Sequence, residues 1–334
     1  MIEFLTYGAT FGLAAGLAAW LTPPLRVAAL RFGIVDRPDE RLKRHREPVP
    51  YLGGIAIYLA FLLSLSFTLR FRAEVLAMLL AGSIVVLLGL LDDFGQLPPW
   101  TKLAGQAVAV LVLVKAGIFV KLVFVPPWLA VPLSILWLLA LTNAFNLIDI
   151  MDGLSAGTAA VAALALFAVA VWNGRTESAT LLAALAGACL GFLRYNFEPA
   201  RIYMGDAGSL LIGLLLGALA MNNGYTRNND LAALAPAMIL GVPIFDMLFV
   251  VYVRWRRGMP VMLGSPDHVA LRLRKWRLST RQTVLASYGA TALLGGAAVT
   301  MSLLDAAGAA GVLGAVVVAA LALGWFLRRI DMSL

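Results

Sequence analysis

The sequence predicts an all-α, polytopic membrane protein, and two observations lead to this fold class. Of the 334 residues, 61% are hydrophobic and only 13% are charged. Many apolar stretches approach the roughly 20 residues that a helix needs to cross a bilayer. The alternating pattern of a membrane barrel is absent, whereas runs of Leu, Ala, Val and Gly dominate. We expect a single integral-membrane domain over residues 1–334.

Apolar runs, and the Pro, Gly and charged residues that interrupt them, predict about eleven transmembrane helices. The first run follows no basic segment and ends without a cleavage site, so it is expected to stay in place as the first span. The run at 209–222 is short for a span. The predicted spans are 3–22, 51–69, 74–91, 102–119, 127–143, 154–172, 178–195, 209–222, 231–253, 283–303 and 308–327.

The distribution of Lys and Arg predicts the orientation. With the N-terminus outside and the C-terminus cytoplasmic, the inner segments carry 20 of the 26 basic residues. The net charge of +8 therefore indicates attraction to membrane lipids and anionic substrates rather than to nucleic acid. The longest inner loop, 254–282, is basic throughout. Its 267–278 part is predicted to form an amphipathic helix at the membrane interface.

Two adjacent carboxylates, Asp92 and Asp93, end the span that begins near Glu74. The C-terminus of a helix carries partial negative charge, so these carboxylates repel each other and the helix dipole. A bound Mg²⁺, a nearby Lys or Arg, or a role as proton acceptor would resolve the repulsion. The alternative is a solvated helix end, which is less favoured for a pair at the edge of a membrane.

Four polar residues recur every third position at Asn143, Asn146, Asp149 and Asp152. If this segment is helical, the four share one face, and Gly153 is expected to end or turn it. Amides and carboxylates together offer donors and acceptors, which suits nucleotide or metal binding. A polar turn between two spans is the alternative.

The segment from Tyr203 to Ser209 precedes another span and contains Gly205, Asp206 and Gly208. The glycines allow backbone N–H groups to approach a phosphate, and the helix expected after Ser209 favours anions at its N-terminus. Asp206 would repel a phosphate unless a Mg²⁺ lies between them. Taken alone, the pattern also fits an ordinary capped turn.

Isolated charged residues supply further candidates. Lys102 begins the helix after the Asp pair and suits either a phosphate contact or an anchor at the inner membrane face. His268 lies beside the basic stretch that contains Arg272, so it is a candidate for a phosphate contact, and His45 is a weaker one. Asp246 lies inside an apolar run, where it is either a functional group or a contact between helices.

Taken together, these segments resemble the polyprenyl-phosphate N-acetylhexosamine-1-phosphate transferase family, a superfamily whose more distant member is phospho-N-acetylmuramoyl-pentapeptide transferase. The resemblance is closer to the branch that transfers GlcNAc-1-phosphate from UDP-GlcNAc to undecaprenyl phosphate. Ile150 departs from the family, which usually has Gly there. His268 is a single His where the pentapeptide transferase has three, which argues against that substrate. The matching segments run in family order through 44–54, 91–106, 143–154, 196–209 and 243–246.

The resemblance implies roles for individual residues. Asp92 and Asp93 match the catalytic pair, and Asp206 matches the aspartate that binds Mg²⁺, with Mn²⁺ as an alternative ion. Asp149 matches a position tied to nucleotide and metal binding and is predicted as a second metal ligand. The residues predicted to bind substrate are Lys102, Asn143, Asn146, Asp152, Asn196, Gly205, Gly208, Ser209, His268, Arg272 and His45.

The implied reaction moves a HexNAc-1-phosphate, most readily GlcNAc-1-phosphate, from a UDP-sugar to polyprenyl phosphate and releases UMP. It would initiate a cell-envelope glycan at the cytoplasmic side of the inner membrane. Direct attack by the lipid phosphate and a covalent phospho-aspartyl route are both open. The sequence leaves the sugar, the pathway, the chain length of the lipid and a homodimer open.

Two other classes of function compete with this enzyme. A secondary transporter would use intramembrane carboxylates to couple ions, but its carboxylates should lie near the bilayer midplane, often in paired halves. Here nearly all of them lie at the inner ends of spans, and no half-to-half match is visible. A catalytically inactive scaffold would not need the full set of aspartates.

Overall fold

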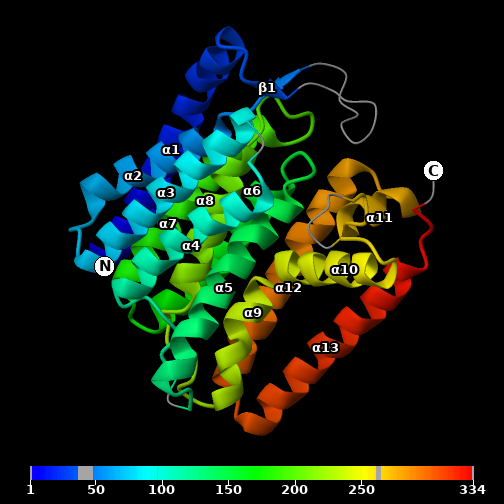
Figure 1. Cartoon of the computed structure of the whole chain (residues 1–334). Coiled ribbons are helices and arrows are strands. Elements are labelled where there is room, and N and C mark those ends of the chain that lie inside the picture. The colour runs from blue at the N-terminus through cyan, green and yellow to red at the C-terminus, as the bar shows by residue number, and fades with distance from the viewer. Residues whose placement is uncertain (1, 37–47, 96, 123, 261–264, 333–334) are drawn as a thin grey trace. The chain divides into compact units, whose positions relative to one another are not determined.

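The computed structural model describes residues 2–36, 48–95, 97–122, 124–260 and 265–332, which form helices almost throughout (Figure 1). Seven of the described helices are long and apolar enough to cross a bilayer. The prediction of an all-α, polytopic membrane protein is therefore confirmed. The chain divides into two compact units, Met1–Asn223 and Gly224–Leu334, and each is described by itself. The single domain over 1–334 stays a prediction.

The first unit consists of eight helices and one small strand pair among its described residues. Strand β1 (Val35–Asp36) pairs antiparallel with β2 (Val49–Pro50). The helices are α1 (Ile2–Arg31), α2 (Gly53–Thr68), α3 (Ala73–Gly95), α4 (Pro99–Lys115), α5 (Pro127–Ile148), α6 (Leu154–Trp172), α7 (Thr176–Asn196) and α8 (Gly205–Ala220).

Helix α8 forms the centre of the first unit. It packs against α2, α3, α5, α6 and α7, and every side chain from Ala207 to Ala220 is buried. A helix that is apolar on all sides is expected in such a position. Its 16 residues extend for only about 24 Å, which is shorter than the hydrocarbon core of about 30 Å. Helix α8 is therefore enclosed by other helices from Ala207 onward, whereas Gly205 and Asp206 in its first turn are only half-buried.

Helix α1 is longer than the predicted first span, because it continues through Pro23 and Pro24 to Arg31. Each of these prolines removes a backbone donor and crowds the preceding turn. Beyond them, the guanidinium of Arg26 donates to the carbonyl oxygen of Arg201 at 2.9 Å, and α1 packs along α7. Tertiary contacts on both sides of the prolines therefore hold α1 as one helix.

The second unit begins with a short 3-10 helix, η1 (Asp230–Leu234), and α9 (Ala235–Ile239), followed by α10 (Gly241–Arg256). The segment from Asp230 to Ile239 bends by 78° relative to α10. Two long helices close the chain. Helix α12 (Thr280–Leu303) starts with a capping box formed by Ser279 and Gln282, and α13 (Ala306–Arg328) is capped by Asp305.

Helix α11 (Val269–Trp276) lies within the range predicted for an amphipathic helix. Its apolar residues Val269 and Leu273 pack against a cluster of Phe249, Val253 and Leu327 from α10 and α13. The apolar side of α11 is thus covered by protein of the same unit. Its location at the membrane interface stays a prediction.

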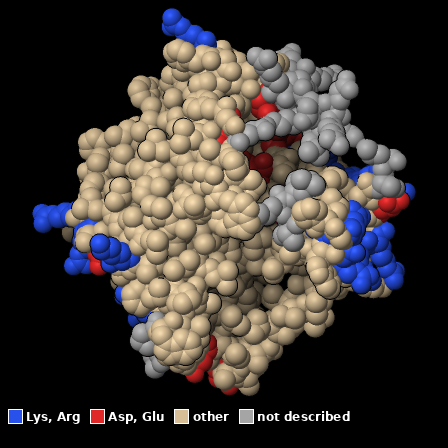
Figure 2. All heavy atoms as spheres, in the orientation of Figure 1, with Lys and Arg blue, Asp and Glu red and all other residues tan. Residues whose placement is uncertain are grey.

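Figure 2 shows that uncharged residues form most of the visible face, while Lys and Arg gather at its margins. Large apolar side chains are exposed on several long helices, among them Trp20 on α1, Leu136 on α5 and Leu293 on α12. Such exposure is unfavourable in water but matches a lipid environment. The surface therefore agrees with the fold class.

Candidate active site

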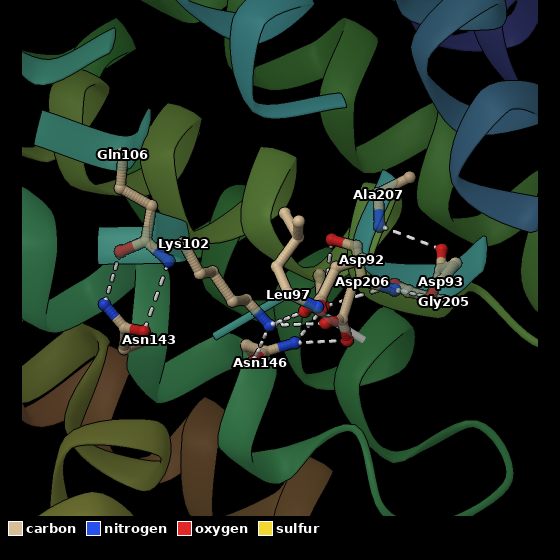
Figure 3. A network of polar contacts seen from close by, with 11 residues as sticks. Asp92, Asp93, Leu97, Lys102, Gln106, Asn143, Asn146, Gly205, Asp206 and Ala207 are labelled. Atoms are coloured by element: carbon tan, nitrogen blue, oxygen red, sulfur yellow. Dashed lines mark hydrogen bonds and ion pairs between the residues drawn. The ribbon is translucent and has the colours of Figure 1, made fainter. Parts of the chain in front are cut away.

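Lys102 is the centre of a polar cluster in the first unit (Figure 3). Its ammonium group pairs with Asp92 at 2.8 Å and donates to Asn146 Oδ1 at 3.1 Å. It also forms an ion pair with the carboxylate of Asp206. These residues lie on α4, α3, α5 and α8. One cation is thus shared by two carboxylates and one amide oxygen from three neighbouring helices.

The turn between α3 and α4 brings Asp92 and Lys102 together. Helix α3 ends at Gly95, as the Asp pair predicts, and α4 starts at Pro99. Proline suits the first turn of a helix because no backbone N–H is needed there. Asp92 Oδ1 accepts a hydrogen bond from the backbone N–H of Leu97 at 2.6 Å. The second oxygen of Asp92 is thereby left to pair with Lys102, one turn into α4.

Asn146 connects the two sides of the cluster. Its oxygen accepts from Lys102, and its nitrogen donates to Asp206 Oδ1 at 2.7 Å and to Ser209 Oγ at 2.9 Å. The Ser209 hydroxyl is buried and donates in turn to the Gly205 carbonyl at 3.2 Å. The predicted site residues Lys102, Asn146, Asp206 and Ser209 therefore form one hydrogen-bonded network.

Asp93 holds the N-terminus of α8. Its Oδ1 accepts from the backbone N–H of Asp206 at 2.9 Å, and its Oδ2 accepts from that of Ala207 at 3.4 Å. The residue at the N-cap position, Met204, supplies no side-chain cap. The carboxylate of Asp93 thus satisfies backbone donors that an N-cap side chain would normally take.

Gly205 is required at the start of α8 by both conformation and space. Its φ of +72° lies in the left-handed region, and an added Cβ would lie 2.6 Å from Asp93 Oδ2. Helix α8 was expected to begin after Ser209. It begins at Gly205 instead, because Asp93 caps it from α3 and Gly205 turns the chain into it.

Backbone hydrogen bonds from the start of α2 and the residues before it also hold the turn that leads into α8. The backbone N–H of Tyr203 donates to Pro50 O at 2.8 Å, and that of Gly54 donates to Met204 O at 2.8 Å. A Cβ on Gly54 would lie 2.2 Å from the backbone nitrogen of Gly208. Gly208, which was predicted to approach a phosphate, therefore lies at a contact where two helix backbones nearly touch.

Two residues of this site were not singled out from the sequence. The hydroxyl of Tyr51 donates to the backbone carbonyl of Asp93 at 2.7 Å. Gln106 on α4 exchanges hydrogen bonds with Asn143 on α5, at 3.3 and 2.6 Å. The signal for Gln106 is its spacing, because it lies four residues after Lys102 on one face of an apolar helix. Asn143 is thus engaged in a contact between helices.

The segment 149–153 differs from its predicted form. The helix ends at Ile148, so the carboxylates at 149 and 152 do not share a helical face with Asn146. Gly153, with φ of +76°, turns the chain into α6. In the turn that follows, buried Asn196 at the end of α7 accepts from the backbone N–H of Gly153 at 3.1 Å and donates to Ile202 O at 3.0 Å. Asn196 thus joins two loops of the site.

The two carboxylates of this loop have different surroundings. Asp152 Oδ2 accepts from the backbone N–H of Ala200 at 2.8 Å. Desolvation raises the pKa of the Asp149 carboxyl well above its usual value, because burial disfavours the charged form. The negative charges of Asp206, Asp93 and Asp152 raise this pKa further. Asp149 is therefore placed where a cation would be favourable.

The donor set fits the predicted Mg²⁺. Oxygen atoms of Asp92, Asp206 and Asn146 converge on one cationic group, the ammonium of Lys102. Carboxylate and amide oxygens are the ligands that Mg²⁺ prefers, with one or two carboxylates and substrate phosphates completing its shell. In the described ranges, no three His, Cys, Asp or Glu side chains form a metal-binding group of their own. The convergent oxygens of Asp92, Asp206 and Asn146 are of the kind that would suit an ion held jointly by protein and substrate.

The remaining predicted residues lie in the second unit or outside the described residues. His268 is buried at the N-cap of α11 and contacts Asp246 through Nδ1 at 2.7 Å. Arg272 is 1% exposed and pairs with Asp267 at 2.6 Å. Its guanidinium also donates to backbone carbonyls at the end of α13. These contacts give Arg272 a structural role in this unit. His45 lies outside the described residues.

Known proteins resemble this chain over most of its length. Residues 75–223 match the family described as glycosyl transferase family 4. A probable undecaprenyl-phosphate N-acetylglucosaminyl 1-phosphate transferase of Bacillus subtilis is 33% identical, over 80% of this chain and 77% of its own length. A decaprenyl-phosphate N-acetylglucosaminephosphotransferase of Mycolicibacterium smegmatis is 34% identical, over 94% and 86%. A phospho-N-acetylmuramoyl-pentapeptide-transferase of Heliobacterium modesticaldum is 31% identical, over 88% and 95%.

Proposed function

Because this chain belongs to glycosyl transferase family 4, we propose that it transfers N-acetylglucosamine 1-phosphate from a UDP-sugar to polyprenyl phosphate and releases UMP. The names of the Bacillus and Mycolicibacterium relatives support this acceptor and this sugar. The single observation that carries the proposal is the cluster around Lys102. It joins two carboxylates and an amide at the ends of helices that are otherwise apolar.

The reaction exchanges one phosphoanhydride for another. An oxygen of the polyprenyl phosphate attacks the phosphorus bonded to the sugar, and the bond from that phosphorus to the oxygen of UMP breaks. Substrates and products carry similar bonds, so catalysis rests on positioning and on neutralising negative charge. Lys102 suits this task, because its ammonium group is held between two carboxylates at the centre of the polar cluster.

Asp206 and Asn146 are the residues that would hold Mg²⁺, with Asp149 as the second carboxylate and with Asp92 assisting if Asp93 is the base. When bound, the ion would neutralise charge on the diphosphate oxygens. Two hydrogen bonds fix the position of Asp206: its backbone N–H donates to Asp93, and its carboxylate accepts from Asn146. The protein thus fixes its proposed metal ligand before substrate arrives.

We assign either Asp92 or Asp93 as the base toward the polyprenyl phosphate. Both oxygens of Asp93 accept from backbone N–H groups of α8, and those of Asp92 contact Leu97 and Lys102. A covalent phospho-aspartyl intermediate is the second route. Trapping of labelled phosphate on the protein when donor is supplied without acceptor would distinguish this route from direct attack.

We further propose eleven crossings, with the N-terminus outside and the cluster facing the cytoplasm of the inner membrane. The seven long helices, the shorter α2, α4 and α8, and the bent segment α9–α10 account for this number. Single cysteines on exposed sites test it, because the native Cys189 is buried. Arg227→Cys, before α9, should react with an impermeant maleimide from outside, whereas Arg274→Cys, after α10, should not. Labelling of both from the same side would mean that α9–α10 turns back within the membrane.

The activity is tested with purified protein in detergent, undecaprenyl phosphate, Mg²⁺ and a panel of UDP-N-acetylhexosamines. We expect UMP release that requires lipid and metal and is lost in Asp92→Asn and Asp206→Asn. Asp305→Asn removes the same charge at an exposed helix cap, where Asn also caps well, so it should retain activity. Folded protein that releases no UMP with any donor would refute the proposal, and ion-coupled transport would then be examined.

A further inference from the structure

Two amide side chains, which we call the amide pair, lie beside the Lys102 cluster without a role in the proposed chemistry. Gln106 on α4 and Asn143 on α5 exchange hydrogen bonds at 3.3 and 2.6 Å (Figure 3). Gln106 is 1% exposed, and the Asn143 nitrogen also donates to Leu139 O at 2.8 Å. Both N–H groups of Asn143 are therefore engaged within the protein, which leaves neither of them to donate to a substrate.

The amide pair lies about one helical turn from the contact between Lys102 and Asn146. On α4, Gln106 follows Lys102 by four residues, and on α5, Asn143 precedes Asn146 by three. Either spacing keeps two side chains on one face of a helix. The ammonium of Lys102 donates to Asn146 Oδ1 at 3.1 Å. Two successive polar contacts thus join α4 to α5, one holding the cation and the other formed by neutral amides.

The ammonium of Lys102 needs support from the surrounding helices because its side chain is flexible. Lysine carries a point charge on a four-carbon stem, so the residue alone does not fix where the charge lies. On one side, Asp92 accepts from the backbone N–H of Leu97 at 2.6 Å and pairs with the ammonium at 2.8 Å. On the other side, α5 must keep Asn146 opposite Lys102. Hydrogen bonds are directional, whereas apolar contacts are not, so the amide pair suits this task.

We propose that the amide pair positions Lys102, because it fixes the rotation and register of α4 against α5 and so places the ammonium between the oxygens of the cluster. The expected loss of turnover rests on the proposed function, whereas the location of the ammonium is a property of the protein alone. A displacement of about 1 Å can lower the rate by roughly 100-fold. Loss of the pair should therefore lower kcat for UMP release by roughly 10- to 100-fold.

Replacing both amides with leucine separates positioning from stabilisation. A single replacement would leave one buried amide without its partner and would destabilise the protein for that reason. The leucine variant, Gln106→Leu/Asn143→Leu, removes both partners and keeps similar side-chain volumes, so its unfolding temperature should stay close to that of the parent while kcat falls. The swapped variant, Gln106→Asn/Asn143→Gln, keeps the combined length of the two amides and should recover most of the turnover.

The location of the ammonium can be followed without any activity, because the chain has only five lysines. With ¹⁵N-lysine labelling in metal-free buffer, NMR detects ammonium protons that exchange slowly with water, and Lys102→Arg identifies the signal of Lys102. This side chain is 15% exposed and pairs with two carboxylates, so we expect slow proton exchange in the parent. We expect fast proton exchange in the leucine variant and slow proton exchange again in the swapped variant.

Trp137→Phe is the matched control. Trp137 also lies on α5, and its Nε1 donates to Gly217 O on α8 at 3.0 Å. The substitution therefore removes a hydrogen bond between helices that does not involve α4. It should leave both kcat and the proton exchange of Lys102 unchanged.

A folded leucine variant with parental turnover or slow proton exchange would overturn the proposal, and so would equal losses in Trp137→Phe. Thermal unfolding and gel filtration show which variants are folded. Should the leucine variant not fold, the swapped variant decides, because slow proton exchange of Lys102 supports the proposal and fast exchange contradicts it. Should the parent protein release no UMP, the proposed function fails, yet the NMR comparison still tests whether the amide pair positions Lys102.

Discussion

Gly89→Ala is the substitution that most sharply tests how the cluster is held. Gly89 lies on α3, one turn before the Asp pair, and faces the first turn of α8. A Cβ at this position would lie 2.3 Å from the backbone nitrogen of Ala207 and 2.5 Å from the carbonyl carbon of Asp206. Backbone atoms cannot rotate away, so α3 and α8 would have to separate.

The size of the separation follows from the contact distance. Ordinary contacts with a Cβ start at 3.4 Å, so the helices must move apart by about 1.1 Å, near the 1 Å displacement that is known to reduce catalysis. The hydrogen bond from Asp206 N–H to Asp93, now 2.9 Å, would lengthen to about 4 Å if the movement followed it, and would be lost. A misplacement of this size lowers turnover by roughly 100-fold. Overpacking should also cost about 1–3 kcal/mol of stability.

Gly82→Ala is the matched control, because Gly82 lies two turns earlier on α3 and faces the same helix. Its added Cβ would meet a flexible side-chain atom, Leu211 Cδ1, at 3.1 Å. This atom needs to move by only about 0.3 Å, so turnover should stay within about threefold of the parent. We would measure kcat for UMP release and the unfolding temperature of both variants. Parent-like turnover in Gly89→Ala, or equal losses in both, would refute the reasoning.

Three further predictions concern the same site. Tyr51→Phe removes the hydrogen bond to the Asp93 carbonyl and should cost about 1 kcal/mol, or roughly fivefold in kcat/KM; an unchanged value would mean that the hydroxyl does not position the Asp pair. Chelation of divalent metal should stop UMP release and added Mg²⁺ or Mn²⁺ should restore it, whereas full activity in excess chelator would exclude a metal requirement. The pKa of Asp149 is raised in the folded protein, so the folded state binds the Asp149 proton more tightly than the unfolded chain does. Proton binding therefore stabilises the folded state at low pH, and this contribution is lost as pH rises from about 4 through the folded pKa. In metal-free buffer at pH 7, Asp149→Asn should therefore unfold at a higher temperature than the parent, with a difference that shrinks toward pH 4; a lower temperature at pH 7 would contradict this sign.

Much of the site could be predicted because its residues are costly in a membrane. Asp92, Lys102, Asn146 and Asp206 stand out as polar groups at the ends of apolar runs, and the structure brings all four together. The end of α3 just after the Asp pair also follows from a local signal, whereas α4 begins at Pro99, three residues before the start predicted at Lys102. The cost of burying a charged side chain, and the Pro, Gly and charged residues that end a helix, can be recognised within short segments of sequence.

The contacts that shape the site could not be predicted in the same way. Asp93 caps a helix that starts 112 positions further along the chain, and Asn196, at the end of α7, binds the turn that follows α5. Such contacts depend on which helices are neighbours, which hydrophobic patterns do not specify. The helix start at Gly205 and the helix end at Ile148 were missed for this reason.

The close approach of helix backbones in the site could not be predicted from the sequence either. Gly54 and Gly89 look like ordinary helix glycines in the sequence, yet each one leaves space for the backbone of α8. Their function appears only when the opposing helix is in place. The site is therefore specified by conspicuous polar residues together with inconspicuous small ones.

The most direct test of the central claim follows the phosphorus atom next to the sugar. UDP-GlcNAc carrying radioactive phosphorus at this position is incubated with protein, Mg²⁺ and undecaprenyl phosphate, and the lipid is extracted. We predict that the label enters the lipid fraction together with the sugar, that unlabelled UMP stays in the water, and that Asp206→Asn abolishes both. Label that stays in the water as UDP while the sugar enters the lipid would contradict sugar-phosphate transfer at this site.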